Sequence, residues 1–338
     1  MTLVPTVTGE ISGEALGFTL AHEHLRARSD RETVEVQFPH LFDVSAEISE
    51  AAAALRKARK LGVRTICDPT VMGLSRDVRF MRAVSEAAGA HVVAATGVYC
   101  LAMLPRYFAN GSIEELASAF IHDLTKGIQG TSIRAGFLKC ATDGAGVTAD
   151  VEKSLRAVAR ASRATGAPIM THTDATARVG LLQQDIFEEE GISLDTVMIG
   201  HCGDSTDLAY LERVARRGSV LGMDRYGMDD ILPTPERNRV VAALVDRGYA
   251  SSMILSHDSV TIAPPLTAPA GSSSRRNWHL THIAEDVLPG LRHLGVSTAA
   301  INEMTIKTPR RWLEGHGKTL RDEDQPIMRA EGPTWSQR

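Results

Sequence analysis

The chain has 338 residues and a formal net charge of -4, with 43% hydrophobic and 23% charged side chains. This composition supplies a large buried core and excludes disordered and fibrous proteins, while the slightly acidic charge provides no basic field for nucleic acid. No run of eighteen apolar residues is present and the first residues lack the pattern of a signal peptide, so we expect a cytoplasmic protein with no membrane partner.

Eight short apolar segments of strand type recur along the chain, and each is followed by a loop and a helical pattern. In chain order, the predicted strands are 17–22, 63–68, 91–97, 134–139, 167–172, 196–201, 219–224 and 252–258. Helical stretches such as 48–62, 154–166 and 207–218 lie between them and end on glycine, as helix C-termini often do. Strands that alternate with helices in this way predict a parallel sheet.

Eight strand–helix units predict a closed (β/α)8 or TIM barrel, which typically needs about 250 residues. We expect residues 1–338 to form one such domain, with a short N-terminal extension and a long loop after strand 8. That loop, residues 261–276, is rich in Pro, Gly and Ser, and is either a lid that shapes the substrate site or a tolerated insertion. The alternative fold, a doubly wound open sheet, usually carries GxGxxG after its first strand, where this chain has AHEHLRARSD.

Polar residues suited to metal binding lie at the ends of five predicted strands. They are His22, His24, Lys139, His172, His201 and Asp258. The first two are two residues apart, so in a strand both imidazoles point to the same face. In a barrel, all of these strand ends meet at the rim where substrates are bound. Histidine nitrogen and carboxylate oxygen suit zinc and other divalent metals, while the absence of cysteine from the set argues against a closed structural zinc site.

Lys139 is the unusual member of this set, because an ammonium group cannot bind a cation. Beside one or two metal ions its pKa would fall, and the free amine could add carbon dioxide. The product is a carbamate, an anionic group that can bridge two metals. That modification would make Lys139 the bridging ligand of a two-metal site.

This arrangement of residues resembles the amidohydrolase superfamily and, within it, the phosphotriesterase family. The resemblance extends from GFTLAHEHL at residue 17 to TIKTPRRWLEG near residue 315. It implies that the more buried metal is held by His22, His24 and Asp258, and the more exposed metal by His172 and His201. Carboxylated Lys139 and a hydroxide would bridge the two ions, with zinc expected and cobalt, manganese or iron as alternatives. The family also suggests a homodimer.

Further stretches resemble the phosphotriesterase-like lactonases within that family. These are GVYC (97–100), THTDA (171–175), IGHCGDSTD (199–207), GMDRYGMDDILP (222–233) and LSHDS (255–259). The resemblance implies that Tyr99 and Arg225 line the substrate entrance, with Tyr226 and Trp278 as weaker candidates for the same wall. The stretch TIAPPLTAPAGSSS (261–274) departs from the lactonase pattern, which leaves the acyl-chain preference open.

The resemblance implies a metal-dependent hydrolase that opens lactone rings, above all those of N-acyl homoserine lactones, which amounts to quorum quenching in a bacterium. The metal-bridging hydroxide would attack the carbonyl carbon, and Tyr99 would donate to the developing oxyanion. Asp258 would accept the proton, and His257 or Asp204 would relay it outward. The same hydroxide would attack the phosphorus of an organophosphate triester as a side activity. The alternatives are an enzyme whose main substrate is an organophosphate and a non-catalytic ligand-binding barrel.

Other polar residues are expected to be structural. Asp204 and Asp207 lie in DSTD, a good helix start, so we expect both to cap the following helix. We expect buried free thiols at Cys67, Cys100, Cys140 and Cys202. Surface or packing roles are expected for His40, His91, His122, His279, His282 and His293.

Overall fold

The computed structural model describes residues 2–27, 31–263 and 275–315, and it confirms the predicted (β/α)8 barrel. One sheet contains eight parallel strands in the order β11-β10-β9-β8-β7-β6-β5-β3. Its strands are β3 (Phe18–Leu20), β5 (Val63–Asp68), β6 (His91–Gly97), β7 (Phe137–Ala141), β8 (Ile169–His172), β9 (Val197–Ile199), β10 (Val220–Met223) and β11 (Met253–Leu255). Neighbours in the sheet follow chain order, as expected for a barrel built from successive strand–helix units.

The two edges of this sheet are joined by the segments that continue its first and last strands. β4 (Glu23–Arg26) follows β3, β12 (Ser259–Ile262) follows β11, and these two short strands pair in parallel. The barrel therefore closes at the carboxyl ends of its strands, directly beside the predicted metal ligands of strands 1 and 8.

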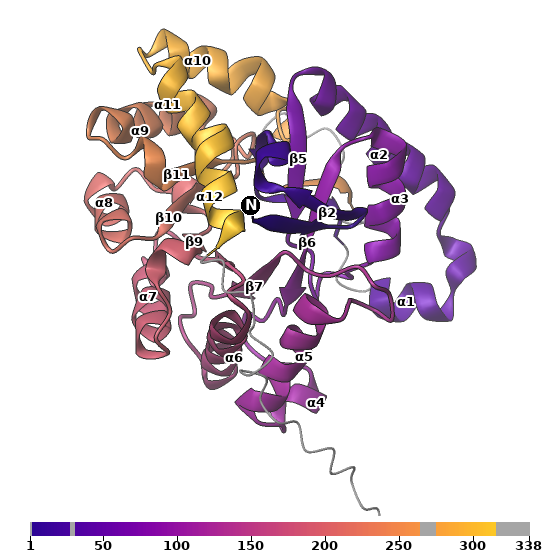
Figure 1. The fold of residues 1–338 in the computed structure, drawn as a ribbon. Coiled ribbons are helices and arrows are strands. Elements are labelled where there is room, and N and C mark those ends of the chain that lie inside the picture. The colour runs from indigo at the N-terminus through magenta and orange to yellow at the C-terminus, as the bar shows by residue number, and fades with distance from the viewer. Residues whose placement is uncertain (1, 28–30, 264–274, 316–338) are drawn as a thin grey trace, which may run out of the picture.

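Helices surround the strands (Figure 1). They are α1 (Arg31–Gln37), α2 (Val44–Lys60), α3 (Val78–Ala88), α4 (Arg106–Ala109), α5 (Ile113–Thr125), α6 (Ala149–Thr165), α7 (Val179–Glu189), α8 (Leu208–Arg216), α9 (Thr234–Asp246), α10 (Leu288–His293), α11 (Thr298–Asn302) and α12 (Thr308–Glu314). The predicted glycine ends are confirmed: α6 ends at Gly166 in the left-handed conformation, and Gly62 and Gly218 follow α2 and α8 with positive φ. Within the described residues, no helix is long and apolar enough to cross a membrane.

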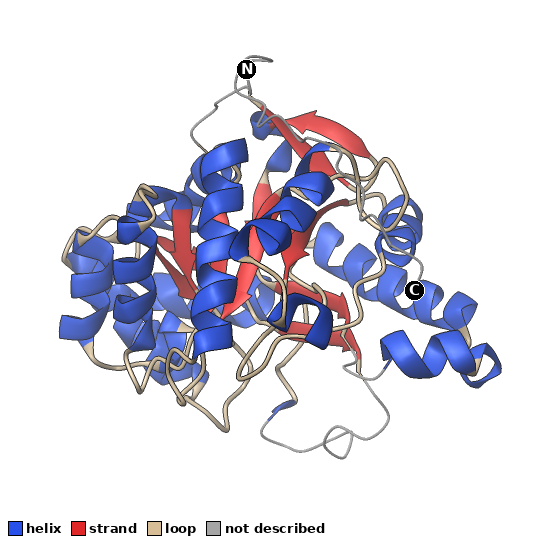
Figure 2. Ribbon diagram, turned by 90° about the horizontal axis from the view of Figure 1, so that it is seen from below, coloured by secondary structure: helices blue, strands red, loops and turns tan. Residues whose placement is uncertain are grey.

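An antiparallel hairpin of β1 (Leu3–Thr6) and β2 (Gly9–Ser12) forms the predicted N-terminal extension. It covers the amino-terminal end of the barrel, where the Val7 amide donates to Val92 at the start of β6. Trp312 of α12 lies at the same end and donates its indole N–H to Ile169 at the start of β8. Figure 2 shows the hairpin at one end of the barrel and long loops at the other.

Alternate residues of each strand face the barrel interior and the surrounding helices. On β6, Val93 and Ala95 belong to an apolar cluster with Phe137 and Trp312, whereas Val92 and Ala94 pack against the helix layer. The interior is therefore filled with apolar side chains toward its amino-terminal end, as in other barrels of this kind. The four cysteines are buried free thiols, as predicted.

Several strand boundaries differ from the sequence prediction. The fourth strand was expected over 134–139 and runs over 137–141, so Lys139 lies within β7 and not at its end. The sixth and eighth strands end at Ile199 and Leu255, before their predicted ligands. His201 and Asp258 follow in left-handed backbone, with φ of 61° and 53°. Apolar patterns predict the buried run of a strand, but not the turn that redirects the side chains after it.

The long loop predicted after strand 8 is described only at its two ends. Thr261 and Ile262 belong to β12, and Arg275 and Arg276 precede the segment that leads into α10. The central part, residues 264–274, lies outside the described residues, so its predicted role as a lid remains a prediction.

Candidate metal centre

His22, His24 and Asp258 form a compact group at the carboxyl-terminal rim. The Nε2 atoms of the two histidines lie 3.2 and 3.3 Å from Oδ1 of Asp258, and ligand atoms from the three residues all lie within 4.8 Å of one another. β3 ends just before His22, and the backbone then turns into β4, which contains His24. The two imidazoles still converge as the sequence predicted, although they do not share one regular strand.

The other three predicted ligands adjoin this group. Nε2 of His201 lies 2.8 Å from Nδ1 of His172, and the rings of His201 and His22 are stacked with centroids 5.2 Å apart. Nζ of Lys139 lies 3.2 Å from Nε2 of His22. The structure therefore brings all six predicted residues together at the carboxyl-terminal rim.

Burial holds two of these histidines in the neutral form that binds metals. The pKa of His22 falls to about 4, chiefly because burial disfavours the charged ring and secondarily because Lys139 is close. Burial and the neighbouring His201 also lower the pKa of His172 well below its usual value. Neutral imidazoles are available as ligands without first losing a proton.

Lys139 is buried inside the barrel, and burial lowers its pKa to about 8 against the opposing effect of Asp258 and Asp224. The lowered pKa makes the neutral amine, which is the nucleophilic form, easier to reach than for an exposed lysine. Gly97 on β6 permits this close packing: its φ is 137°, and a Cβ there would lie 1.9 Å from the Lys139 carbonyl oxygen.

Asp224, which the sequence analysis did not assign, orients two of the histidines. Its Oδ2 lies 2.7 Å from Nδ1 of His22, and its Oδ1 lies 2.9 Å from Nδ1 of His201 and accepts the His201 amide. Burial alone would raise the pKa of Asp224, but the two imidazoles outweigh that effect and hold it far below the usual range. A signal was present, because Asp224 ends the predicted seventh strand at the same rim.

The donor set fits divalent metal ions. Asp224 occupies Nδ1 of His22 and His201, which leaves both Nε2 atoms for the centre, as is usual for metal-binding histidines with a carboxylate behind them. His24 is held in the same way, with Nδ1 2.7 Å from Oγ1 of Thr70. His22, His201 and Asp224 also lie close enough to form a second metal group. However, the Asp224 oxygens are already engaged by the ring and backbone N–H groups, so we assign Asp224 to orientation.

Arg225 bridges two carboxylates and excludes the predicted proton path through Asp204. Its Nε donates to Oδ2 of Asp258 over 3.1 Å, and its Nη1 donates to Oδ2 of Asp204 over 2.9 Å. A guanidinium stays protonated in proteins, so it cannot pass a proton from one carboxylate to the other. Asp204 also pairs with Arg237. The prediction that Asp204 caps α8 is therefore wrong, whereas the same prediction for Asp207 is confirmed.

His257 is also excluded as a proton relay, because both of its ring nitrogens have structural partners. Nδ1 lies 2.7 Å from Oε1 of Glu23, and Nε2 accepts the Ile283 amide over 3.0 Å. The ring is fully buried, and its two nitrogens point to Glu23 and Ile283. The sequence showed that His257 adjoins Asp258, but both residues lie between β11 and β12, and the left-handed backbone at Asp258 gives the two side chains different neighbours.

The four predicted substrate-wall residues have different environments. Tyr99 lies at the centre, with its hydroxyl 3.4 Å from Nδ1 of His172, and burial raises its pKa so that it remains a donor. Arg225 lies beside Asp258. Tyr226 is a correction: it is fully buried and donates to Asn238, because its side chain turns into the packing under α9. Trp278 is partly exposed and donates to the His257 carbonyl.

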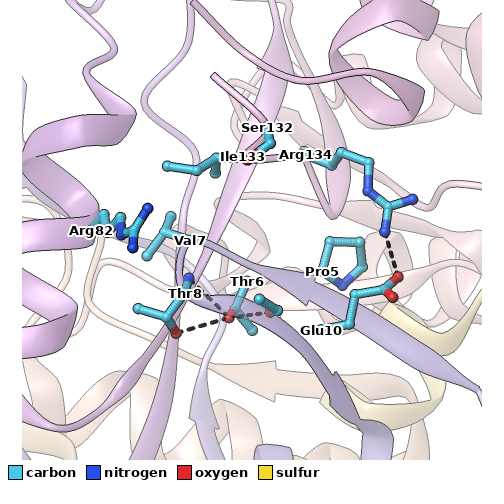
Figure 3. A pocket seen from close by; sticks show the side chains of 10 residues that line it. Pro5, Thr6, Val7, Thr8, Glu10, Arg82, Ser132, Ile133 and Arg134 are labelled. Carbon is cyan, nitrogen blue, oxygen red and sulfur yellow. Dashed lines mark hydrogen bonds and ion pairs between the residues drawn. The ribbon is translucent and has the colours of Figure 1, made fainter.

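Two cavities lie outside this cluster. One of about 610 Å³ lies between α2, β12 and residues 278–281, and Trp278 lines it. The other, of about 200 Å³, lies at the amino-terminal end between the β1–β2 hairpin, Arg82 and residues 132–134 (Figure 3). Arg134 points across it to Glu10 of the hairpin, with which it forms an ion pair. None of the six predicted metal ligands lines either cavity.

The protein belongs to the class of (β/α)8 barrels with a candidate metal centre at the carboxyl-terminal rim. The pattern of the phosphotriesterase family matches residues 2–313, and the chain is therefore a member of the phosphotriesterase family. This confirms the resemblance to the phosphotriesterase family that was inferred from the sequence.

Several characterised proteins match almost the whole chain. An aryldialkylphosphatase of Saccharolobus solfataricus is 43% identical over 305 residues, which are 90% of this chain and 96% of that protein. A solved structure of the phosphotriesterase from Mycobacterium tuberculosis matches with a TM-score of 0.88 and 41% identity, covering 93% of this chain and 98% of that chain. An N-acetyltaurine hydrolase of Salmo salar is 25% identical over 346 residues, covering 92% and 97% of the two chains. These names support a hydrolase.

Proposed function

We propose that this protein is a two-metal lactonase that opens lactone rings, with N-acyl homoserine lactones as the expected substrates and organophosphate triesters as side substrates. The observation that carries the proposal is the convergence of six ligand-type residues beside a tyrosine hydroxyl. The Tyr99 hydroxyl lies 3.4 Å from His172, so a donor faces the place where a substrate carbonyl would be activated. Its position suits an oxyanion or the ring oxygen of a lactone.

The ligand assignment follows the two groups of side chains. The more buried ion would be held by His22, His24 and Asp258, and the more exposed ion by His172 and His201. Carboxylated Lys139 would bridge them, since its buried amine has a lowered pKa and lies 3.2 Å from His22. Zinc is the proposed metal. When bound, two divalent ions supply a hydroxide nucleophile near neutral pH and polarise the substrate's oxygen.

The chain's own residues would orient the substrate and manage the proton. Tyr99 donates to the oxygen that gains charge during attack. Asp258 accepts the nucleophile's proton at Oδ2, the oxygen that Arg225 contacts. Because the guanidinium cannot accept that proton, Asp258 returns it to the alkoxide released when the ring C–O bond breaks. The product is a hydroxy acid.

The alternative proposal keeps the same site and makes an organophosphate triester the main substrate. The 43% identical aryldialkylphosphatase supports it, since that name describes a triester hydrolase. Both reactions need an attacking hydroxide and a polarised oxygen, so the residues of the centre serve either one. They differ in the leaving group: a lactone releases an alkoxide that needs a proton, whereas an activated aryl ester releases a more stable anion.

Relative rates separate the two proposals. Metal-loaded protein is assayed with a short-chain and a long-chain acyl homoserine lactone and with an aryl dialkyl phosphate, and kcat/KM is compared. The lactonase proposal predicts faster turnover of at least one lactone. Faster turnover of the triester supports the alternative, and complete inactivity on lactones contradicts the lactonase.

A further inference from the structure

Glu23 lies between two predicted metal ligands and points to the opposite side of the strand. It is fully buried and accepts four hydrogen bonds from the segment that flanks Asp258. Oε1 accepts the amide of His257 over 2.9 Å and its ring Nδ1 over 2.7 Å. Oε2 accepts the amide of Ser259 over 3.1 Å and its hydroxyl over 2.7 Å. One carboxylate thus binds the residues immediately before and after Asp258.

The backbone of Asp258 needs such support. Its φ of 53° is uncommon for a residue with a side chain, and such conformations persist only where the surroundings over-determine them. Its own amide donates to the His22 carbonyl over 2.9 Å. Three consecutive amides, those of residues 257, 258 and 259, are therefore all bound by His22 and Glu23.

The partner of Glu23 is itself held in one tautomer. Nε2 of His257 accepts the Ile283 amide, so the ring proton lies on Nδ1 and points to Glu23. Trp278 donates to the His257 carbonyl. The segment around Asp258 is therefore supported from two sides, by Glu23 of β4 and by residues 278–283.

We propose that Glu23 is a positioning residue that sets Asp258 against His22 and His24, so that the three ligands of the more buried ion form one preorganised group. This proposal rests on the metal assignment of the proposed function. The segments that supply these ligands are far apart in the chain. Glu23 and Ser259, which join the two segments, are separated by 236 residues. Without Glu23, the same three ligands would have to be ordered by the ion itself.

The test is Glu23→Gln, which preserves the size of the side chain but places an amide N–H₂ against donors. Zinc affinity is measured by competition with a chromophoric chelator, and the visible spectrum is recorded after cobalt loading. The affinity for one of the two ions should fall by about 10- to 100-fold, as for other residues that orient metal ligands. The cobalt spectrum should change as the coordination geometry loosens.

Glu190→Gln is the matched control, because Glu190 is a largely buried carboxylate that binds Arg156 and Arg160 away from the centre. It should leave zinc affinity and the cobalt spectrum unchanged. If metal-free Glu23→Gln does not fold, as judged by circular dichroism, Ser259→Ala decides: removing one hydroxyl donor should shift affinity and spectrum in the same direction by less.

Wild-type affinity and spectrum in a folded Glu23→Gln, or in Ser259→Ala where the first variant is unfolded, would overturn the proposal. This outcome is distinct from failure of the lactonase proposal, because no substrate is used. A wild type that binds two ions but cleaves no lactone would contradict only the substrate.

Discussion

The two ends of the barrel bury side chains of opposite character. At the amino-terminal end, Phe137 and Trp312 pack with ring centroids 5.4 Å apart beneath the hairpin. At the carboxyl-terminal end, two residues further along β7, Lys139 lies among histidines and carboxylates. The same strand thus contributes an apolar residue to one end and an ionisable amine to the other, because residues i and i+2 share a face.

The apolar end of the barrel interior therefore contributes mainly to stability, and the polar end is the part suited to chemistry. At the apolar end, burial of apolar side chains by itself stabilises the folded state. At the polar end, moving charged groups out of water destabilises the folded state. Hydrogen bonds and, in our proposal, metal ions offset that cost. His201, Arg225 and Asp258 have left-handed backbone at this end of the barrel strands, and such strained conformations cluster at functional sites. Changes at the two ends should therefore have different consequences.

The largest expected effect is loss of activity in Asp258→Asn. The amide binds cations poorly and cannot accept the proton, so kcat/KM should fall by at least about 10⁴-fold for lactone and triester alike, as when one member of a catalytic unit is removed. Steady-state kinetics on both substrates measure it. Asp123→Asn is the control, since Asp123 binds Arg76 and Thr96 far from the cluster. Retained activity in Asp258→Asn would place the chemistry elsewhere.

The opposite end should respond in stability only. Trp312→Ala removes a fully buried ring, and its expected cost is about 3–5 kcal/mol of unfolding free energy. Chemical denaturation of metal-loaded protein measures this loss. Zinc stoichiometry and kcat per folded molecule should remain at wild-type values, and a fall in either would show that the two ends are coupled.

Tyr99→Phe should separate the two substrates. Loss of the hydroxyl donor should lower kcat for a lactone by about 10²-fold, with a smaller effect on an aryl triester, whose leaving group needs less help. Tyr226→Phe is the matched control: its hydroxyl binds Asn238 under α9, so it should cost stability and leave the ratio of the two rates unchanged. Equal losses on both substrates in Tyr99→Phe would exclude a lactone-specific role.

The smallest expected effect is a pH dependence far from the centre. Burial would raise the pKa of Glu190, but Arg160 and Arg156 outweigh it and hold the pKa below its usual 4.5. A depressed carboxyl pKa contributes stability that is fully present above pH 4.5 and is lost as pH falls through the lower folded-state value. The difference in unfolding free energy between wild type and Glu190→Gln should therefore shrink on acidification. A constant difference would contradict this.

The sequence predicted the barrel, the strand order and all six clustered residues, because strand periodicity and strand ends determine which residues reach one rim. It did not predict Asp224 or Glu23 as supporting residues. Asp224 contacts the Nδ1 atoms of His22 and His201, which follow other strands. Glu23 accepts hydrogen bonds from a segment 236 residues further along the chain. Such contacts depend on the closed barrel and have no local pattern.

The predictions that failed depended on side-chain direction. Tyr226 adjoins Arg225, yet the left-handed φ of 64° at Arg225 sends the two side chains to different places. His257 adjoins Asp258 and faces away from it, toward Glu23. Asp204 binds arginines rather than a helix terminus, because Arg237 of α9 reaches it from outside its own segment. In each case the position in the sequence placed the residue near the candidate site, but it did not show which residues the side chain contacts.

The most direct test of the central claim is the metal content of purified protein, measured by elemental analysis after growth with added zinc, cobalt or manganese. We predict two equivalents per chain in the wild type and fewer in Lys139→Ala, with lactone and triester hydrolysis lost in that variant. Less than one equivalent in the wild type would contradict a two-metal centre and favour a barrel that binds ligands without catalysis.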